Sequence, residues 1–360
     1  MLPFENIYTY WDHLLNIFVI AVAFFQLPVF LPRVLSHNYK LLLPFLILSV
    51  WVSVCVFVGS PSEDWPVRTS LITIGISFLI CSQVHRDDLS RVRYFVLLLA
   101  AAFSLYTLLY GQYSLKMILN GSLNTQLGIK LNPANVIIFP RIMYMLVITC
   151  IATLIIEKDK WLRIGAALVM IIPILIAFAT GNRGTMVALA AAAFILMLSF
   201  RTKREIILSG VVIIVLLIIS YVIVPELLPL TKQRIISGGR DNSSISRFYM
   251  AREALDINNM SLIGRGASAD YPHNIFIEFY LNYGIIGLVL FLLVLATSVI
   301  TARKCYRITG DNEVLWVLSL LTLQMVSQQF SLDIFYGALW AAMVLPLGLR
   351  WNPSVPVGNE

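Results

Sequence analysis

Residues 271–287 read Tyr-Pro-His-Asn-Ile-Phe-Ile-Glu-Phe-Tyr-Leu-Asn-Tyr-Gly-Ile-Ile-Gly, and apolar residues follow to about position 300. His273 thus stands at the start of a long apolar segment, directly after the longest polar stretch of the chain. Because Pro272 suits a first helical position and Asp270 can serve as a cap, we expect a helix to begin here. The amino end of a helix attracts anions through its unpaired N–H groups. Two interpretations follow: this segment forms a site that acts on an anionic substrate, or it is a capped helix beside a solvated histidine.

The whole chain has the composition of a membrane protein. Of its 360 residues, 59% are hydrophobic and only 12% are charged. Many apolar runs reach the roughly 18–20 residues that cross a bilayer as a helix. The sequence therefore predicts an all-α fold, a polytopic bundle of transmembrane helices.

About eleven segments are long and apolar enough to be spans. The predicted spans are 14–31, 41–59, 67–84, 93–111, 134–156, 162–180, 184–200, 206–224, 274–300, 314–331 and 334–349. No internal repeat is present in the sequence. We expect a single membrane domain over residues 1–360, with one larger loop outside the membrane, residues 225–273, between the eighth and ninth spans.

Lysine and arginine gather at alternate connections between the predicted spans, as the positive-inside rule expects of cytoplasmic loops. These connections carry Arg33 and Lys40; Arg86, Arg91 and Arg93; Lys158, Lys160 and Arg163; Arg201, Lys203 and Arg204; and Arg303, Lys304 and Arg307. The amino terminus is then predicted to lie outside and the carboxyl terminus in the cytoplasm. The net charge of +7 is spread over short loops and does not indicate a nucleic-acid partner.

Several basic residues are nevertheless predicted at the outer side, where the positive-inside rule disfavours them. Arg141 lies roughly 10 Å into its span at a rise of 1.5 Å per residue. Ionisable residues in spans usually face a cavity, a partner or a substrate; the alternative is a side chain that snorkels to the interface. Arg68 begins the third span. Arg183 lies in the turn 181–184, which is either an ordinary polar turn or a place where glycines let a ligand approach the backbone closely.

The predicted outer loop holds further candidates. From Ser246 its pattern is amphipathic, so we expect a short surface helix lying on the bilayer. Arg247, at the start of this helix, can bind a phosphate group with two hydrogen bonds. Arg252 is equally suited to pairing with a neighbouring carboxylate or with water. Arg265 lies in a flexible turn, residues 264–268, that leads to His273.

Glu278 lies one helical turn after Asn274 and can orient a neighbour, or it can be buried and paired. Common catalytic signatures are missing from the sequence. It contains no Walker-type GxxxxGK[ST], no HExxH, no GxSxG, no metal-spaced His/Cys cluster and no DxD pair. We therefore expect neither a metal ion nor a cofactor.

The order of these motifs resembles the O-antigen ligase and O-antigen polymerase superfamily of bacterial envelope glycosyltransferases. The resemblance rests on Gly181-Asn182-Arg183-Gly184, Ser246-Arg247-Phe248, Gly264-x-Gly266, and above all Pro272-His273-Asn274 followed by Gly284-Ile285-Ile286-Gly287-Leu288. Asn182 stands where the family more often has serine. The motif-rich part covers about residues 180–290, and the earlier helices match only as generic spans.

The resemblance implies an enzyme of the bacterial inner membrane that transfers an oligosaccharide from undecaprenyl pyrophosphate to a sugar hydroxyl, with inversion and without metal or nucleotide, on the periplasmic side. His273 is then the general base that accepts the hydroxyl proton. Arg183, Arg247, Arg141 and Arg265 bind the pyrophosphate. The residues of second rank are Arg68, Arg252, Asn274 and Glu278.

The acceptor is left open by these motifs. A polymerase extends a lipid-linked glycan, whereas a ligase moves the finished chain to lipid A–core; we favour a polymerase because polymerases are the more numerous group. Membrane lipids are expected partners, and a polysaccharide chain-length regulator is a partner that the resemblance leaves open. A flippase for lipid-linked oligosaccharides is the alternative from another class, but it predicts charges at the membrane centre and internal repeats.

Overall fold

The computed structural model describes residues 39–59, 81, 84–110, 138–179, 183–199, 242–256, 261–264, 274–330 and 337–349. Every regular element in these ranges is helical, which confirms the predicted all-α class. The elements are α2 (Tyr39–Gly59), the 3-10 helix η2 (Arg86–Asp88), α4 (Leu89–Tyr110), α7 (Ile138–Ile156), α8 (Lys160–Ala179), α9 (Arg183–Met197), α13 (Asn242–Ala254), α14 (Ile275–Thr309), α15 (Asn312–Ser327) and α16 (Gly337–Gly348).

Each described α-helix except α13 coincides with a predicted span. Of these helices, α14 (Ile275–Thr309) is the one whose described residues are long and apolar enough to cross a bilayer by length and composition. The predicted spans 14–31 and 206–224 lie outside the described residues, as does 67–84 apart from Cys81 and Val84. The predicted number of spans therefore stays a prediction.

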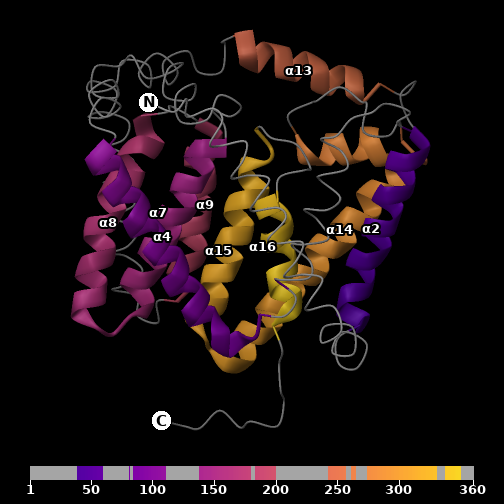
Figure 1. Cartoon of the computed structure of the whole chain (residues 1–360). Helices are drawn as coiled ribbons and strands as arrows, with labels where there is room; N and C mark the ends of the chain where they lie inside the picture. Colours follow the sequence, from indigo (N-terminus) through magenta and orange to yellow (C-terminus); the bar gives the residue numbers. More distant parts are fainter. Residues whose placement is uncertain are drawn as a thin grey trace.

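The helices form a bundle with α15 and α16 at its centre (Figure 1). Helices α4, α7, α8 and α9 lie on one side, and α2 and α14 lie on the other. Helix α15 contacts α9, α7, α16, α14 and α4, so it links the two sides. We call the end at which α14 begins and α15 ends the upper end, as drawn in Figure 1, and the opposite end the lower end. Helix α13 lies across the upper end.

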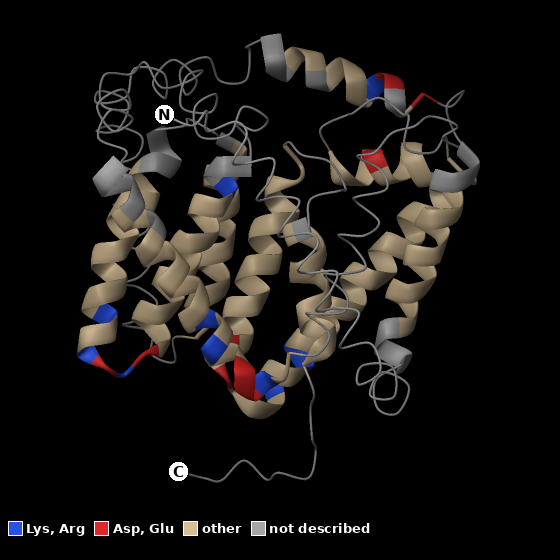
Figure 2. Ribbon diagram, in the orientation of Figure 1, with Lys and Arg blue, Asp and Glu red and all other residues tan. Residues whose placement is uncertain are grey.

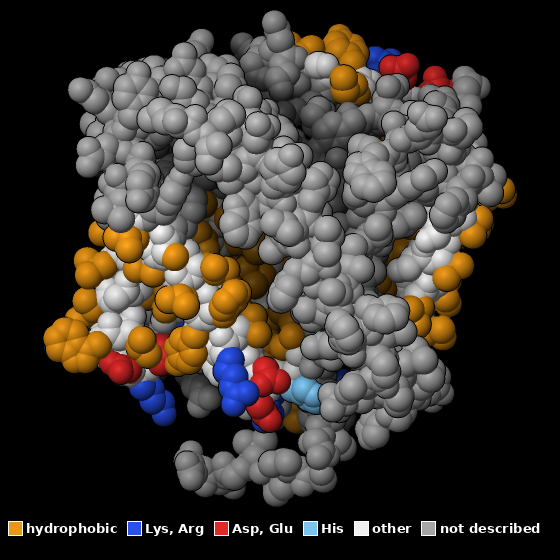
Figure 3. Space-filling view, in the orientation of Figure 1, with side chains coloured by type: hydrophobic (Ala, Val, Ile, Leu, Met, Phe, Trp, Pro, Cys, Tyr) orange, Lys and Arg blue, Asp and Glu red, His pale blue; other side chains and the backbone are white. Residues whose placement is uncertain are grey.

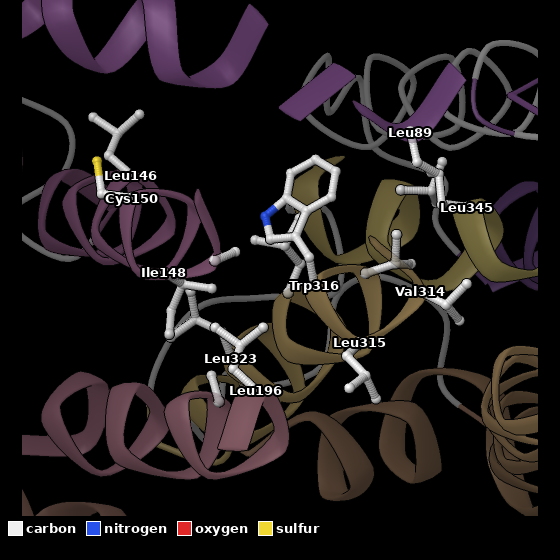
Figure 4. Close-up of a cluster of buried hydrophobic side chains, with 14 of the residues drawn as sticks. Leu89, Leu146, Ile148, Cys150, Leu196, Val314, Leu315, Trp316, Leu323 and Leu345 are labelled. Atoms are coloured by element: carbon white, nitrogen blue, oxygen red, sulfur yellow. The ribbon is translucent and has the colours of Figure 1, made fainter. Parts of the chain in front are cut away.

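Helix α15 is central because it is apolar on all its sides. Its buried residues include four in succession, Val314, Leu315, Trp316 and Val317, which cannot share one face of a helix. Figure 4 shows Trp316 surrounded by leucine and isoleucine side chains from α7, α9 and α15. The indole Nε1 of Trp316 donates a hydrogen bond to Thr149 Oγ1 at 3.2 Å, so its one polar atom is satisfied.

The outer surface of the bundle is apolar, and the charges lie at its ends. Leu98, Phe194 and Ile300 are 65%, 61% and 64% exposed, and Figure 3 shows hydrophobic side chains along the visible flanks. An apolar surface of this extent suits contact with lipid. Figure 2 shows charged residues concentrated at the lower end. The described connections that were predicted to be cytoplasmic all lie at this end. This agrees with an up-and-down bundle, in which alternate connections lie at the same end.

Helix α14 breaks at Gly284, so the predicted continuous span 274–300 is wrong in this respect. Gly284 has φ 69° and ψ −172°, a conformation that favours glycine and ends one helical segment before the next begins. The N–H groups of Ile285 and Ile286 donate instead to the carbonyl oxygens of Ser261 (3.1 Å) and Leu262 (3.4 Å). The first segment thus lies across the upper end, and the second descends through the bundle (Figure 1).

Close packing of two backbones explains why glycine is needed at the break. A Cβ atom at Gly284 would lie 2.2 Å from Leu262 O, and one at Gly264 would lie 2.5 Å from Asn282 O. Both glycines also have positive φ angles. The two glycine motifs of the sequence therefore meet in space, where Trp51 Nε1 of α2 donates to Tyr283 O at 3.0 Å.

Candidate functional site at the upper end

Three helices converge on the turn 327–330, which follows α15 at the upper end. Arg141 Nη2, from the first turn of α7, donates to Ser327 O at 2.6 Å. The first N–H of α14, from Ile275, donates to Gln328 O at 3.2 Å. Helix α9 approaches so closely that a Cβ atom at Gly184 would lie 2.4 Å from Phe330 Cβ. The turn thus brings together the starts of α7, α9 and α14.

Arg141 points into the bundle. Its side chain is 0% exposed, so it does not snorkel to the interface. The described part of α7 begins at Ile138, and residues 134–137 of the predicted span lie outside the described residues. Burying a guanidinium is costly unless it is hydrogen-bonded. Its bond to Ser327 O therefore makes the arginine a fixed positive charge beneath the 327–330 turn.

The start of α14 differs from the prediction. The cap is Asn274 and the first helical residue is Ile275, not Asp270 and Pro272. Asn274 Oδ1 accepts from the N–H groups of Phe276 (3.0 Å) and Ile277 (3.3 Å). Two of the four orphan N–H groups of the helix are thereby satisfied by one side chain.

A relay of amide groups ties this cap to α15. Asn274 Nδ2 donates to Gln329 Oε1 at 3.0 Å, and Gln329 Nε2 donates to Met325 O at 3.0 Å. Hydrogen bonds to both the oxygen and the nitrogen of the Asn274 amide therefore fix the orientation of this side chain. His273 precedes this cap directly in the sequence and lies outside the described residues.

Arg183 is the first residue of α9, although its side chain is outside what the structure describes. Since Gly184 touches the 327–330 turn, the amino end of α9 lies beside the amino end of α14. Each helix start carries about half a positive charge. Two helix starts and the buried Arg141 bring positive charge to this corner, close to the Glu278 carboxylate in the first turn of α14, and helix starts are places where an anion can bind.

Buried polar groups line the first segment of α14. Glu278 is 3% exposed, and its N–H donates to Asn274 O at 2.9 Å. A carboxylate in the first turn interacts favourably with the helix dipole. Asn282 Oδ1 and the Tyr280 hydroxyl are buried without a hydrogen-bond partner in the described structure. Such atoms commonly bind water or a ligand.

Of the remaining predicted residues, Arg252 lies in α13, and the others fall wholly or partly outside the description. Arg252 is exposed near the end of α13, where Phe248 and Tyr249 are 66% and 61% exposed. Arg247 also lies in α13, which begins at Asn242 rather than at the predicted Ser246, and its side chain is not described. Arg68 and Arg265 lie outside the described residues.

The sequence interpretation missed Gln328 and Gln329. Both were counted within the apolar span 314–331. The available signal was the polar run 327–329 at the end of an otherwise apolar segment. Such a run is common at the end of any span, so it does not by itself predict which helices it contacts.

The lower end contains a separate ionic cluster around Arg93. Its guanidinium bonds both carboxylate oxygens of Glu313 at 2.8–3.0 Å, Glu157 Oε1 at 2.6 Å and Thr153 Oγ1 at 2.9 Å. Burial acts to raise the pKa of Glu157, but hydrogen bonds from Tyr94 and Arg93 outweigh it and lower that pKa. The cluster joins α4, α7 and α15 at the end opposite the 327–330 turn.

Comparison with curated proteins gives no match. A comparison with family models does: residues 166–292 match the family described as O-antigen ligase. The matched segment contains most of α8, all of α9 and α13, and the start of α14, whereas Arg141 and the 327–330 turn lie outside it. The match and α14, which is long and apolar enough to cross a bilayer, are both consistent with a membrane protein. Residues 166–292 are thus similar to the O-antigen ligase family, which confirms the resemblance of this part of the chain to the O-antigen ligase and polymerase superfamily.

Proposed function

We propose that the protein transfers an oligosaccharide from undecaprenyl pyrophosphate to a sugar hydroxyl at the upper end, which faces the periplasm. The family match supports a glycosyltransferase of the O-antigen ligase or polymerase type. In this proposal the residues 225–273 form the periplasmic loop, the amino terminus is periplasmic and the carboxyl terminus is cytoplasmic. The concentration of described charges at the lower end supports this orientation.

One observation carries the proposal: the starts of α9 and α14 and the buried Arg141 all contact the 327–330 turn. Two motifs of the resemblance contribute to those two helix starts: Gly184 of the first motif, and Asn274, which directly follows His273 in the sequence. They are about ninety residues apart in the sequence. Their meeting at one turn supports a shared site for an anionic leaving group and a base.

The reaction follows from these groups. The acceptor hydroxyl oxygen attacks the anomeric carbon of the donor sugar, and His273 takes the hydroxyl proton. The bond between that carbon and the pyrophosphate oxygen breaks with inversion, and both electrons leave with undecaprenyl pyrophosphate. Arg183, Arg247 and Arg265 bind the pyrophosphate as its charge grows. Arg141 is buried, so it contributes positive charge from beneath and holds the turn.

A polymerase is the proposed acceptor class, with a growing lipid-linked glycan as acceptor. The description of the matching family, O-antigen ligase, favours lipid A–core as the second candidate. Both acceptors supply a sugar hydroxyl to the same base. A polymerase and a ligase therefore differ in which acceptor molecule binds at the site, and an assay with both acceptors distinguishes them.

The test uses the purified full chain, lipid-linked oligosaccharide as donor, and either the same lipid-linked repeat or lipid A–core as acceptor. No nucleotide or metal is added. His273→Ala and Arg183→Ala are compared with the wild type and with Arg303→Ala, which removes an exposed arginine at the lower end. We expect a loss of at least about a hundredfold in both site variants and none in the control.

Longer lipid-linked chains identify a polymerase, and product on lipid A–core identifies a ligase. Full activity in His273→Ala removes the proposed general base. Transfer to neither acceptor, with movement of the donor across the membrane in vesicles, would replace the transferase by a flippase.

A further inference from the structure

Residues 261–264 and Gly284 form a joint at the break in α14. Two carbonyl groups of residues 261–264 accept the N–H groups that open the second segment of α14. A Cβ atom at Gly284 would lie 2.7 Å from Gly264 N, so the backbones of the two glycines are in contact. The chain between them, residues 265–283, therefore leaves this joint and returns to it.

His273 belongs to the stretch that the joint closes. It follows Gly264 by nine positions and precedes Gly284 by eleven. Its neighbour Asn274 is tied to the end of α15 through Gln329. The position of the proposed base thus depends on two anchors. One is the Asn274 cap, and the other is the joint at which the first segment of α14 ends.

Helix α2 holds the joint with two side chains on one of its faces. Trp51 and Cys55 are four positions apart, so they share a face of the helix. Trp51 Nε1 donates to Tyr283 O at 3.0 Å, and Cys55 Sγ donates to Ile263 O at 3.3 Å. The two bonds reach the residue before each glycine of the joint, so α2 contacts both of the chain segments that meet there.

The carbonyl group of Tyr283 needs a donor from outside its own segment. The last carbonyl groups of a helical segment have no partner within it. Glycine also makes room for the indole, because a Cβ atom at Gly287 would lie only 3.3 Å from Trp51 Nε1. A buried acceptor that loses its donor costs more than the bond itself. Trp51 is therefore placed to decide how the backbone lies at the break.

We propose that Trp51 is a positioning residue for the transfer reaction, with Cys55 in a supporting part. It acts through the carbonyl group of Tyr283 and sets the direction in which the first segment of α14 runs from the break. His273 directly precedes the cap at the far end of that segment. The inference rests on the proposed function, because it takes His273 as the base.

Small errors of direction at the break are large errors at the base. The first segment of α14 is roughly 13 Å long at a rise of 1.5 Å per residue. A tilt of about 5° at the break therefore moves its far end by about 1 Å. A misplacement of about 1 Å can lower the rate of a reaction by about a hundredfold. The bond from Trp51 limits such a tilt.

The test compares the purified full chain with Trp51→Phe, which keeps an aromatic ring and removes the N–H donor. Trp161→Phe makes the same change at a tryptophan that is 77% exposed on α8, and it is the matched control. Cys55→Ser keeps a donor, whereas Cys55→Ala removes it with little change in volume. Each protein is assayed for transfer from lipid-linked oligosaccharide. Hydrogen–deuterium exchange over residues 275–286 is measured alongside by mass spectrometry.

We expect Trp51→Phe to lower kcat about tenfold and to leave KM for the donor within about twofold. Its amide exchange over residues 275–286 should be faster than in the wild type. Cys55→Ser should match the wild type in both measurements. Cys55→Ala should lower kcat less than Trp51→Phe does, because a thiol is a weak donor.

Unchanged kcat in Trp51→Phe would overturn the proposal, whatever its amide exchange. An equal loss in Trp161→Phe would also overturn it, as would a loss of kcat that the fraction of unfolded protein fully explains. Transfer to neither acceptor by the wild type would instead refute the proposed function. Amide exchange then decides whether α2 holds the joint, and equal exchange in Trp51→Phe and the wild type would show that it does not.

Discussion

Gly284 and Gly165 both lie inside apolar helices, yet a methyl group has opposite effects at the two positions. At Gly284 the φ of 69° and the contact of 2.2 Å between an added Cβ and Leu262 O both oppose alanine. A non-glycine residue held at this φ and ψ costs about 1–3 kcal/mol. At Gly165 the space is open, and alanine in a helix is favoured by about 0.5–1 kcal/mol.

We therefore expect Gly284→Ala to lower the midpoint of thermal unfolding in detergent and Gly165→Ala to leave it unchanged or raise it. Both variants add the same atoms to an apolar helix, so each is the control for the other. Equal midpoints would show that the break in α14 is not held by glycine. Activity is expected to follow the same order, because the break sets the direction of the segment that carries Asn274.

At the scale of elements, the amide relay between α14 and α15 controls how the start of α14 is oriented. Asn274→Ser keeps a capping oxygen but removes the Nδ2 donor to Gln329. Gln329→Met removes the same bond from the other side. We expect each to lower kcat for transfer by about tenfold through misplacement of the adjacent base, with little change in KM for the donor. The double variant should be no worse than either single one.

Steady-state kinetics of the four proteins, with unfolding midpoints measured alongside, check this prediction. Additive losses in the double variant would mean that the two residues act separately. A fall in midpoint that matches the loss of activity would instead indicate a structural role. The relay would then stabilise the helix without positioning the base.

The helices were more predictable from the sequence than their ends and their contacts. Hydropathy alone located α2, α7, α8 and α15, because an apolar run of this length indicates a helix that spans a membrane. Capping preferences placed the cap of α14 at Asp270 instead of Asn274, because several residues before an apolar run can cap it. The break at Gly284 depends on residues 261–264, and the role of Gln329 depends on a partner 55 positions away. Neither has a local signal.

At the scale of the whole molecule, the two ends are built differently. The upper end gathers helix starts and a buried arginine around the 327–330 turn. At the lower end Arg93 is instead neutralised by Glu157 and Glu313, and it joins α4, α7 and α15. We infer that the lower cluster is a clamp that holds the bundle together while the upper end binds substrate.

The clamp predicts how stability depends on pH. The pKa of Glu157 is lowered in the folded protein by hydrogen bonds from Tyr94 and Arg93 that outweigh its burial. A carboxylate with a lowered pKa stabilises the fold above its unfolded pKa of about 4.3, and this contribution is lost as pH falls through the folded value. The unfolding midpoint of Glu157→Gln should therefore lie below that of the wild type at pH 7, and this difference in midpoint should disappear on acidification below about pH 4.

Asp87→Asn removes a carboxylate that is 85% exposed and serves as the control, with no such difference in midpoint expected. A difference that stays constant from pH 7 to pH 3 would mean that Glu157 acts by packing and not by its charge, and the ionic clamp would lose its support.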